Sequence, residues 1–303
     1  MKKYVYSVPK LNESEKRAFV QKCEDEFEIQ LERAAQKIIQ DKCKIITLSG
    51  PTCSGKTTTA SRFISVVENI GGTVGVISID DFYKSREQLT KESKERGLLK
   101  VDYDSALSID LDYFEECIDG ILEKRNVKLP RYSFTEGKRT ELYDFASEKF
   151  DYIILEGIQA VYPEVTEHIH CGYKSVQISV ATDVEVNGSS FTSRQVRFLR
   201  RMIRDSKFRG APPEVTFGMW KGVAENEDLH IMPFAGQYDI ELDSYMEYEP
   251  FMIKSIVMAL LESIPESNEY YNKAEEIRSK FKNFFDISPE YLPKESVYHE
   301  FLG

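Results

Sequence analysis

The sequence lacks the long apolar runs of a membrane protein and has few of the residues that mark unstructured chains. Although 41% of its 303 residues are hydrophobic, no run approaches the roughly 18 consecutive apolar residues of a membrane-spanning helix. Residues 1–4 lead into charged residues rather than into the apolar core of a signal peptide. The 16 glycines and 11 prolines are too few for a low-complexity chain. We therefore expect a globular, cytoplasmic protein with no membrane partner.

Cysteine and histidine are also scarce. The five cysteines are odd in number, widely spaced and without a C-x-x-C pair, which argues against a disulfide framework and against a structural zinc site. The four histidines are not spaced with cysteines or acids in the manner of metal ligands. They are His168, His170, His230 and His299. We expect each of them to lie at the surface or to be satisfied by an ordinary hydrogen bond.

Positive charge does not dominate the chain. It carries 40 Lys and Arg against 51 Asp and Glu, a net charge of −11. Such a chain does not coat a phosphate backbone with its whole surface, so we expect no nucleic-acid partner, and any basic function must be local. The length, about twice that of a typical domain, allows one large domain or two small ones.

Residues 12–42 carry apolar side chains at every third or fourth position, which predicts a long amphipathic helix. Asn12, with Glu15 three residues later, is a typical capping signal at the start of a helix. These residues carry no chemistry that we can name. We therefore expect residues 1–42 to be an N-terminal helical extension, packed either on the body of the protein or on a second copy in a homo-oligomer.

Five short β-rich runs predict buried parallel strands. They cover residues 43–48, 72–79, 152–155, 175–180 and 239–242. Helical patterns lie between the first two runs and in residues 109–125, 250–263 and 268–285. Since the chain shows no repeat, linker or break in composition, we expect residues 43–303 to form one doubly wound α/β domain around a mostly parallel five-stranded sheet.

Residues 50–57 match the phosphate-loop pattern G-x-x-x-x-G-K-[ST] in full and lie between a predicted strand and a predicted helix. In such a loop, glycines let backbone N–H groups turn toward a phosphate, and the N-terminus of the next helix adds positive potential. Lys56 would contact the β- and γ-phosphates, and the Thr57 hydroxyl would bind Mg²⁺. We expect ATP to be bound by Gly50, Thr52, Cys53, Ser54, Gly55, Lys56, Thr57 and Thr58.

Two adjacent acids, Asp80 and Asp81, follow the second predicted strand. The carboxyl ends of the strands are where doubly wound sheets place their ligands. Because successive strand residues point to opposite faces, both acids cannot face the γ-phosphate. A carboxylate here could accept the proton of an attacking hydroxyl or bind magnesium through water. The alternative is a pair of solvated turn aspartates.

Six motifs in order, covering about residues 44–242, resemble the uridine kinase-like family of P-loop kinases. Besides residues 50–57 they are Ser78, Asp80, Phe82 and Tyr83; Tyr103 and Asp104; Pro130, Tyr132 and Phe134; Leu155, Glu156, Gly157 and Ile158; and Arg200, Arg201, Arg204, Asp205, Arg209 and Gly210. The resemblance implies the P-loop NTPase fold and ATP-dependent phosphorylation of the 5′-hydroxyl of a ribonucleoside.

The resemblance also implies roles for single residues. Asp80 matches the catalytic base of the family and Tyr83 an aromatic beside the nucleoside. Asp104 matches the carboxylate that holds the ribose hydroxyls, which is sound hydrogen-bond chemistry for a vicinal diol. Glu156, with Thr57 and Asp80, matches the magnesium-associated groups, although an acid after a strand can also be a simple cap. Residues that match the lining of the base pocket are Tyr132, Phe134 and Arg139.

One segment departs from the pattern of uridine and cytidine kinases. These kinases carry an aspartate where this chain has Ser133 and a pyrimidine-reading histidine where it has Gly137. The loss of a partner at the base edge is expected to weaken discrimination among bases. The segment is more similar to a broader bacterial nucleoside kinase branch. Uridine or cytidine is therefore only one candidate acceptor.

Residues 194–209 hold seven basic residues against one acid. In the family this is a lid helix, here about residues 190–212, that closes over the triphosphate and excludes water. The resemblance makes Lys56, Arg201 and Arg204 catalytic and places Arg200 on the nucleotide and Arg197 on the acceptor. A solvated charged helix is the alternative.

Two other functions stay open. The acceptor could be another small alcohol, as in phosphoribulokinase or pantothenate kinase. The chain could also be a regulatory P-loop NTPase that binds a protein or RNA. ATP consumption that rises when a nucleoside is added would distinguish a nucleoside kinase, such as a salvage enzyme, from this regulator.

Overall fold

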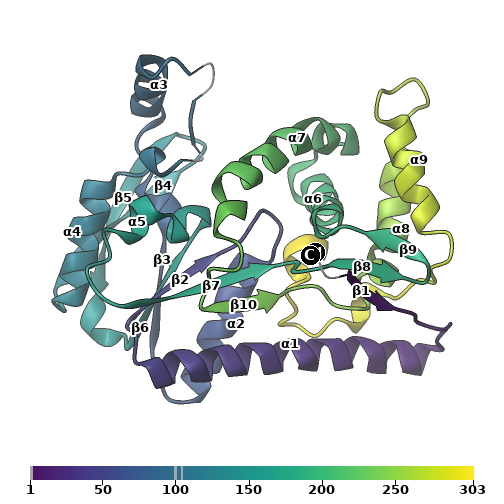
Figure 1. The fold of residues 1–303 in the computed structure, drawn as a ribbon, viewed down its shortest axis with the longest axis horizontal. Coiled ribbons are helices and arrows are strands. Elements are labelled where there is room, and N and C mark those ends of the chain that lie inside the picture. The colour runs from purple at the N-terminus through teal and green to yellow at the C-terminus, as the bar shows by residue number, and fades with distance from the viewer. Residues whose placement is uncertain (1–2, 99–100, 104) are drawn as a thin grey trace.

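A five-stranded parallel sheet forms the centre of the computed structural model, which describes residues 3–98, 101–103 and 105–303 (Figure 1). Its strand order is β10-β7-β2-β6-β3, and every neighbouring pair is parallel. The strands are β2 (Ile45–Ser49), β3 (Val74–Ser78), β6 (Tyr152–Glu156), β7 (Tyr173–Ser179) and β10 (Ile240–Asp243). The predicted doubly wound α/β fold with five parallel strands is confirmed.

The sheet is covered by helices on both faces, as its apolar strands require. All five residues of β2 are buried: Ile46 and Leu48 contribute to one core cluster, whereas Ile45 contributes to the other. The first face carries α1 (Glu13–Asp41) and α2 (Lys56–Asn69), and the second carries α4 (Leu111–Leu122). Because all strands are parallel, their carboxyl ends meet at one edge of the sheet.

The N-terminal residues are built into this body. Asn12 and Glu15 form the predicted capping box at the start of α1. The buried face of α1 belongs to the same core cluster as α2, and α1 runs along the sheet below β10 and α2 (Figure 1). Strand β1 (Lys3–Tyr6), which the sequence did not predict, pairs in parallel with β8 (Asp183–Val186), and β8 pairs with β9 (Ser189–Phe191).

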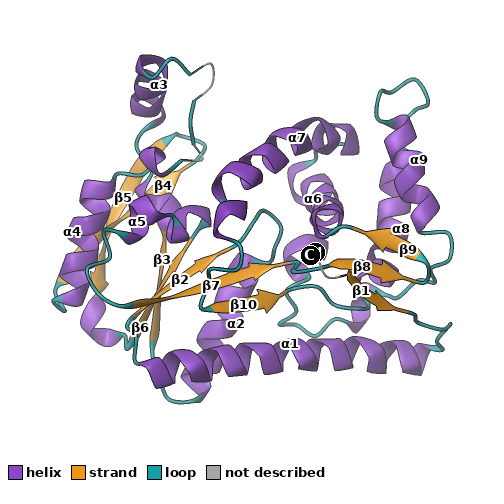
Figure 2. Ribbon diagram, viewed as in Figure 1, coloured by secondary structure: helices purple, strands orange, loops and turns teal. Residues whose placement is uncertain are grey.

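A two-stranded antiparallel hairpin was also not predicted. It consists of β4 (Asn126–Ser133) and β5 (Lys138–Ala146) and projects beside β3 (Figure 2). The remaining helices are α3 (Arg86–Glu95), α5 (Pro163–Thr166), α6 (Ser193–Arg209), α7 (Pro213–His230), α8 (Glu249–Glu262), α9 (Tyr271–Lys280) and α10 (His299–Leu302). Among the described residues, no helix is both long and apolar enough to cross a membrane.

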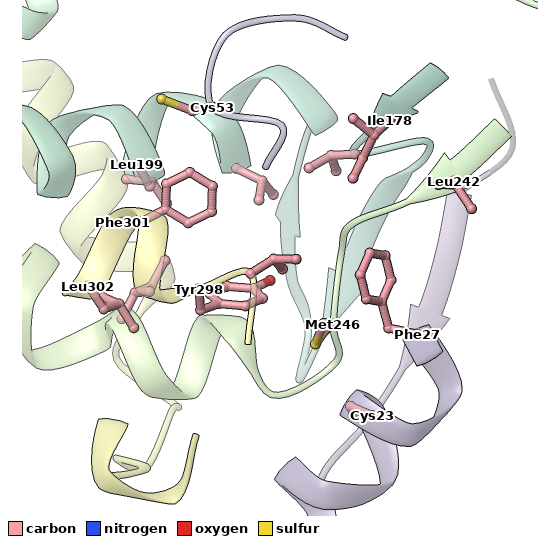
Figure 3. Close-up of a cluster of buried hydrophobic side chains, with 14 of the residues drawn as sticks. Cys23, Phe27, Cys53, Ile178, Leu199, Leu242, Met246, Tyr298, Phe301 and Leu302 are labelled. Atoms are coloured by element: carbon pink, nitrogen blue, oxygen red, sulfur yellow. The ribbon is translucent and has the colours of Figure 1, made fainter. Parts of the chain in front are cut away.

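The last residues return to the middle of the molecule. Tyr298, Phe301 and Leu302 are buried in the core cluster that also holds Leu199 of α6 and Cys53 of the phosphate loop (Figure 3). A contact between segments that are nearly 250 residues apart therefore lies directly beneath the predicted nucleotide site.

Candidate functional site

The phosphate loop joins the end of β2 to the start of α2. A Cβ added at Gly50 would lie 2.1 Å from the carbonyl oxygen of Ile178, so this position accepts only glycine. Cys53 and Gly55 have positive φ angles of 56° and 93°, which turn the chain into α2. No side chain caps the N-terminus of α2. The first N–H groups of this helix are therefore open to an anion, as phosphate binding requires.

Three carboxylates interact electrostatically with the ammonium group of Lys56. Its ammonium donates a hydrogen bond to the carbonyl of Pro51 at 3.3 Å. Burial lowers the pKa of Lys56, and Glu300, Glu156 and Asp80 act in the opposite direction. The lysine is thus held between the phosphate loop and acids from three other segments, where it could meet phosphate oxygens.

Asp80 and Asp81 lie in a short 3-10 turn, η1 (Ile79–Phe82), directly after β3. Burial and the nearby Glu156 raise the pKa of Asp80 to about 6, against the opposing charge of Lys56. Asp81 turns toward the hairpin and accepts a hydrogen bond from the Tyr132 N–H at 2.9 Å. The two carboxylates therefore face different partners, and Asp80 is the one beside the phosphate loop. The expected strand alternation is not the cause, since β3 ends at Ser78 and the 3-10 turn separates the two side chains.

Oxygen donors suitable for Mg²⁺ come from three elements. Ser78 and Glu156 are register partners on β3 and β6, and the Ser78 hydroxyl donates to the Glu156 carboxylate at 2.8 Å. Thr57 is exposed in the first turn of α2. A hydroxyl and two carboxylates are the donor types that Mg²⁺ prefers, and the carboxylates of Asp80 and Glu156 are close enough to repel each other, which a bound cation would relieve. These residues therefore fit the predicted metal.

An aromatic cluster adjoins Asp80. The rings of Tyr83, Tyr132 and Phe134 lie 5.2–5.8 Å apart, measured between centroids. Phe134 is 60% exposed, whereas Tyr83 and Tyr132 are nearly buried. The structure thus brings together the three aromatics that the sequence analysis assigned to the acceptor. Asp104, the predicted ribose ligand, lies outside the described residues.

Arg139 differs from the prediction. Its guanidinium donates to the carbonyl of Phe82 at 3.0 Å and to Asp110 at 2.9 Å, and lies over the ring of Tyr113. Asp110 is in turn the N-cap of α4. Arg139 therefore ties the hairpin to η1 and to the start of α4.

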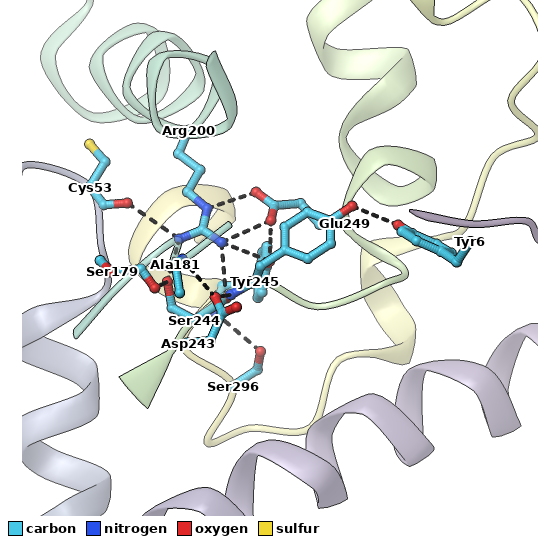
Figure 4. Close-up of polar contacts among 11 residues, drawn as sticks. Tyr6, Cys53, Ser179, Ala181, Arg200, Asp243, Ser244, Tyr245, Glu249 and Ser296 are labelled. Carbon is cyan, nitrogen blue, oxygen red and sulfur yellow. Dashed lines mark hydrogen bonds and ion pairs between the residues drawn. The ribbon is translucent and has the colours of Figure 1, made fainter. Parts of the chain in front are cut away.

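Arg197 and Arg200 also differ from the prediction that they contact ligands. The guanidinium of Arg200 is fully buried and donates to Glu249, Ser244, Tyr298 and, at 3.4 Å, to the carbonyl of Cys53 (Figure 4). Arg197 pairs with the buried Glu227 at 2.8 Å and donates to the carbonyl of Thr52 at 3.3 Å. Both arginines thus hold the phosphate loop from behind, because buried acids fix their guanidinium groups.

Arg201 and Arg204 of α6 are close enough for their charges to act on the Cys53 thiol of the loop. Both donate to Asp205, at 3.2 Å and 2.8 Å, and their side chains are only 11% and 15% exposed. Arg204 also interacts electrostatically with Cys53 and Glu300. The predicted catalytic arginines are therefore close to the phosphate loop, and Asp205 pairs with both of them.

The structure adds two residues that the sequence analysis missed. Glu300 of α10 accepts a hydrogen bond from the Thr58 hydroxyl at 3.3 Å, although no sequence signal connects the two. Gln159 lies just beyond Glu156 and donates to the Tyr83 hydroxyl at 2.8 Å, while its buried side-chain oxygen has no hydrogen-bond partner among the described residues. The only feature of the sequence that could have indicated Gln159 is its position three residues after Glu156.

A phosphate loop at the carboxyl edge of a parallel sheet, with acids beside its lysine, defines a P-loop phosphotransferase that acts on an alcohol acceptor. The chain belongs to the phosphoribulokinase/uridine kinase family, whose sequence model matches residues 45–247.

Relatives of this chain are named as uridine kinases. It is 26% identical over 214 residues to a uridine kinase of Lactobacillus helveticus, a match that covers 67% of this chain and 92% of the relative. It is 30% identical over 198 residues to a uridine kinase of Staphylococcus aureus strain JH9, covering 65% and 85%. A solved structure of a "putative fructose transport system kinase" from Silicibacter sp. TM1040 shares the fold, with a TM-score of 0.50 and 14% identity over 70% of this chain and 98% of that one.

Proposed function

We propose that the protein is an ATP-dependent nucleoside kinase that transfers the γ-phosphoryl group of Mg·ATP to the 5′-hydroxyl of a ribonucleoside, as in nucleoside salvage. One observation carries the proposal. Asp80 is close to Lys56 and Glu156, and the turn that holds it ends at Tyr83, which belongs to the aromatic cluster. A base in this position can serve a hydroxyl held by the aromatics while the phosphate loop holds the donor.

Each group of residues around Asp80 has a separate role in the proposed reaction. Tyr83, Tyr132 and Phe134 form a surface on which an aromatic base can stack, and stacking accepts any base. Asp80 takes the proton of the attacking 5′-hydroxyl, and its pKa near 6 leaves it ionised at neutral pH. Bound magnesium would supply charge neutralisation at the phosphate oxygens, held by Thr57, Asp80 and Glu156.

The helix α6 supports the donor side. Arg201 and Arg204 lie where they can exchange Asp205 for a charged phosphoryl oxygen, whereas Arg197 and Arg200 keep the loop carbonyls in place. We assign residues 43–303 to the kinase domain, with residues 190–212 covering the nucleotide and residues 1–42 as the N-terminal extension. Positive charge held in place beforehand, as by these arginines of α6, is the main source of catalysis in phosphoryl transfer.

A panel of acceptors tests the proposal. Purified protein is incubated with Mg²⁺ and ATP and with each of the common ribonucleosides, and also with fructose, glycerate and pantothenate as non-nucleoside alcohols. We expect ADP release that depends on a nucleoside, with a nucleoside 5′-monophosphate as the product. ADP release with a non-nucleoside alcohol alone would transfer the assignment to that acceptor. ADP release that no acceptor changes would favour a regulatory NTPase.

A further inference from the structure

Two histidines and two acids meet on the face of α4, far along the chain from the phosphate loop. Glu115 and Asp119 are four residues apart and so lie on one side of the helix. His168 and His170 lie in the segment between α5 and β7. Ile169, between them, is buried in the core that α4 covers. The chain is thus anchored by Ile169 and turns both imidazoles toward the acids.

The contacts among these four side chains are close. His168 Nδ1 lies 2.9 Å from one oxygen of Glu115, and His170 Nε2 lies 3.0 Å from the other. His170 Nδ1 lies 3.0 Å from Asp119. One ligand atom from each of Glu115, Asp119 and His170 can be chosen so that all three lie within 4.8 Å of one another. His168 and His170 are thus hydrogen-bonded, as expected, but their spacing in the sequence did not indicate that their partners are acids from α4.

The charge of the cluster is not balanced by lysine or arginine. In the part of the chain that the structure describes, Glu115 and Asp119 form ion pairs only with the two histidines. With neutral imidazoles the cluster carries two negative charges, so a divalent cation would neutralise it. Its side chains are between 26% and 48% exposed, which leaves an entry path for an ion.

We propose that Glu115, Asp119 and His170 form a binding site for a transition-metal ion of the zinc type, with His168 as a positioning residue that holds the Glu115 carboxylate. Mixed nitrogen and carboxylate donors favour Zn²⁺ and its neighbours over Mg²⁺, which prefers oxygen. In a tetrahedral site with bonds of about 2.1 Å, ligand atoms lie roughly 3.4 Å apart. One oxygen each from Glu115 and Asp119 and one nitrogen of His170 lie within 4.8 Å of one another, so side-chain rotation can bring them to this spacing, and water would take the fourth position.

The site is separate from the catalytic one. His170 lies just before Tyr173, which pairs with Ile45 at the start of β2, whereas the phosphate loop follows the end of β2. A bound ion would therefore act as a clamp that fastens the segment before β7 to α4, and it would take no part in phosphoryl transfer.

Calorimetry on tag-free, metal-stripped protein in excess Mg²⁺ tests the site. Titration with Zn²⁺ is expected to show one ion per chain, and saturating zinc is expected to raise the melting temperature by about 5 °C. The double variant His168→Ala/His170→Ala should lose at least about 100-fold in affinity. The matched control His230→Ala/His299→Ala should bind zinc as the wild type does.

Two further measurements separate ligand loss from unfolding. Glu115→Gln keeps the shape of the side chain and should weaken zinc binding as well. Co²⁺ bound to the wild type should give the visible absorption of a tetrahedral site, and this signal should be missing in the double variant. The proposal is overturned if the wild type takes up no zinc, or if the double variant binds it as tightly as the control.

Discussion

Replacing Asp80 by asparagine should remove activity and stabilise the protein at the same time. The folded protein raises the pKa of this carboxyl from 3.8 to about 6, mainly through burial and through Glu156. Between about pH 4 and pH 6 the folded state therefore binds the proton more tightly than the unfolded chain does, and stability falls as the pH rises through this window. A shift of this size corresponds to about 3 kcal/mol at neutral pH, in the absence of metal and nucleotide.

Asparagine cannot ionise, so Asp80→Asn should recover up to this amount. We expect the variant to unfold at a higher denaturant concentration than the wild type at pH 7.5, and the difference should vanish at about pH 4. Its kcat should fall by about 100- to 10,000-fold because a general base is lost. In the wild type, kcat/KM should rise with pH through about pH 6, where Asp80 loses its proton.

Asp81→Asn is the matched control. Its side chain keeps an oxygen that can accept the Tyr132 N–H, so the hairpin stays attached and the loss of kcat should be much smaller. Chemical denaturation, pH-dependent kinetics and calorimetric ATP binding of the three proteins measure these effects. Two results would refute the assignment of Asp80 as a catalytic base with a raised pKa: equal losses of kcat in both variants, or an Asp80→Asn variant that is less stable than the wild type at pH 7.5.

Three other predictions follow from the arginines and the loop. Arg200→Met leaves Glu249 buried without its partner and should lower the free energy of unfolding by about 3–5 kcal/mol in urea titrations; a loss below about 1 kcal/mol would contradict the buried pair. Arg201→Ala and Arg204→Ala should each lower kcat by about 100-fold while the KM for the nucleoside changes little, and an unchanged kcat in both would leave α6 without a catalytic role. Gly50→Ala places a Cβ against a backbone carbonyl of β7 and should abolish ATP binding in calorimetry, so an unchanged affinity would show that the loop can shift.

Local patterns were sufficient for the sheet and the phosphate loop. The strands β2, β3 and β6 are short, mostly apolar runs, and their length, β-branched residues and neighbouring glycines distinguish them from helix segments. The phosphate loop consists of the consecutive residues 50–57, and the capping box joins Asn12 to Glu15, three positions later. In each case the interacting groups are close in sequence, so spacing carries the information.

Contacts between distant segments escaped the sequence analysis. Lys3 pairs with Asp183 across 180 positions, and nothing in residues 3–6 indicates this partner. The resemblance placed Arg197 and Arg200 of α6 on ligands, but their partners Glu227 and Glu249 come from other helices. Tertiary structure decides whether an arginine pairs with a ligand or with a buried acid. The helical periodicity of the sequence carries no information on this point.

The burial of residues 297–302 beneath the phosphate loop sets an order of events during synthesis. The loop emerges from the ribosome when only about a sixth of the chain exists, yet Cys53 and Thr58 reach their partners in α10 only after residue 302 has emerged. At about 5–20 residues per second, the interval is on the order of 12–50 s. The sheet is itself complete only when β10 has been made, so the packing of α10 against the phosphate loop is among the last steps of folding during synthesis.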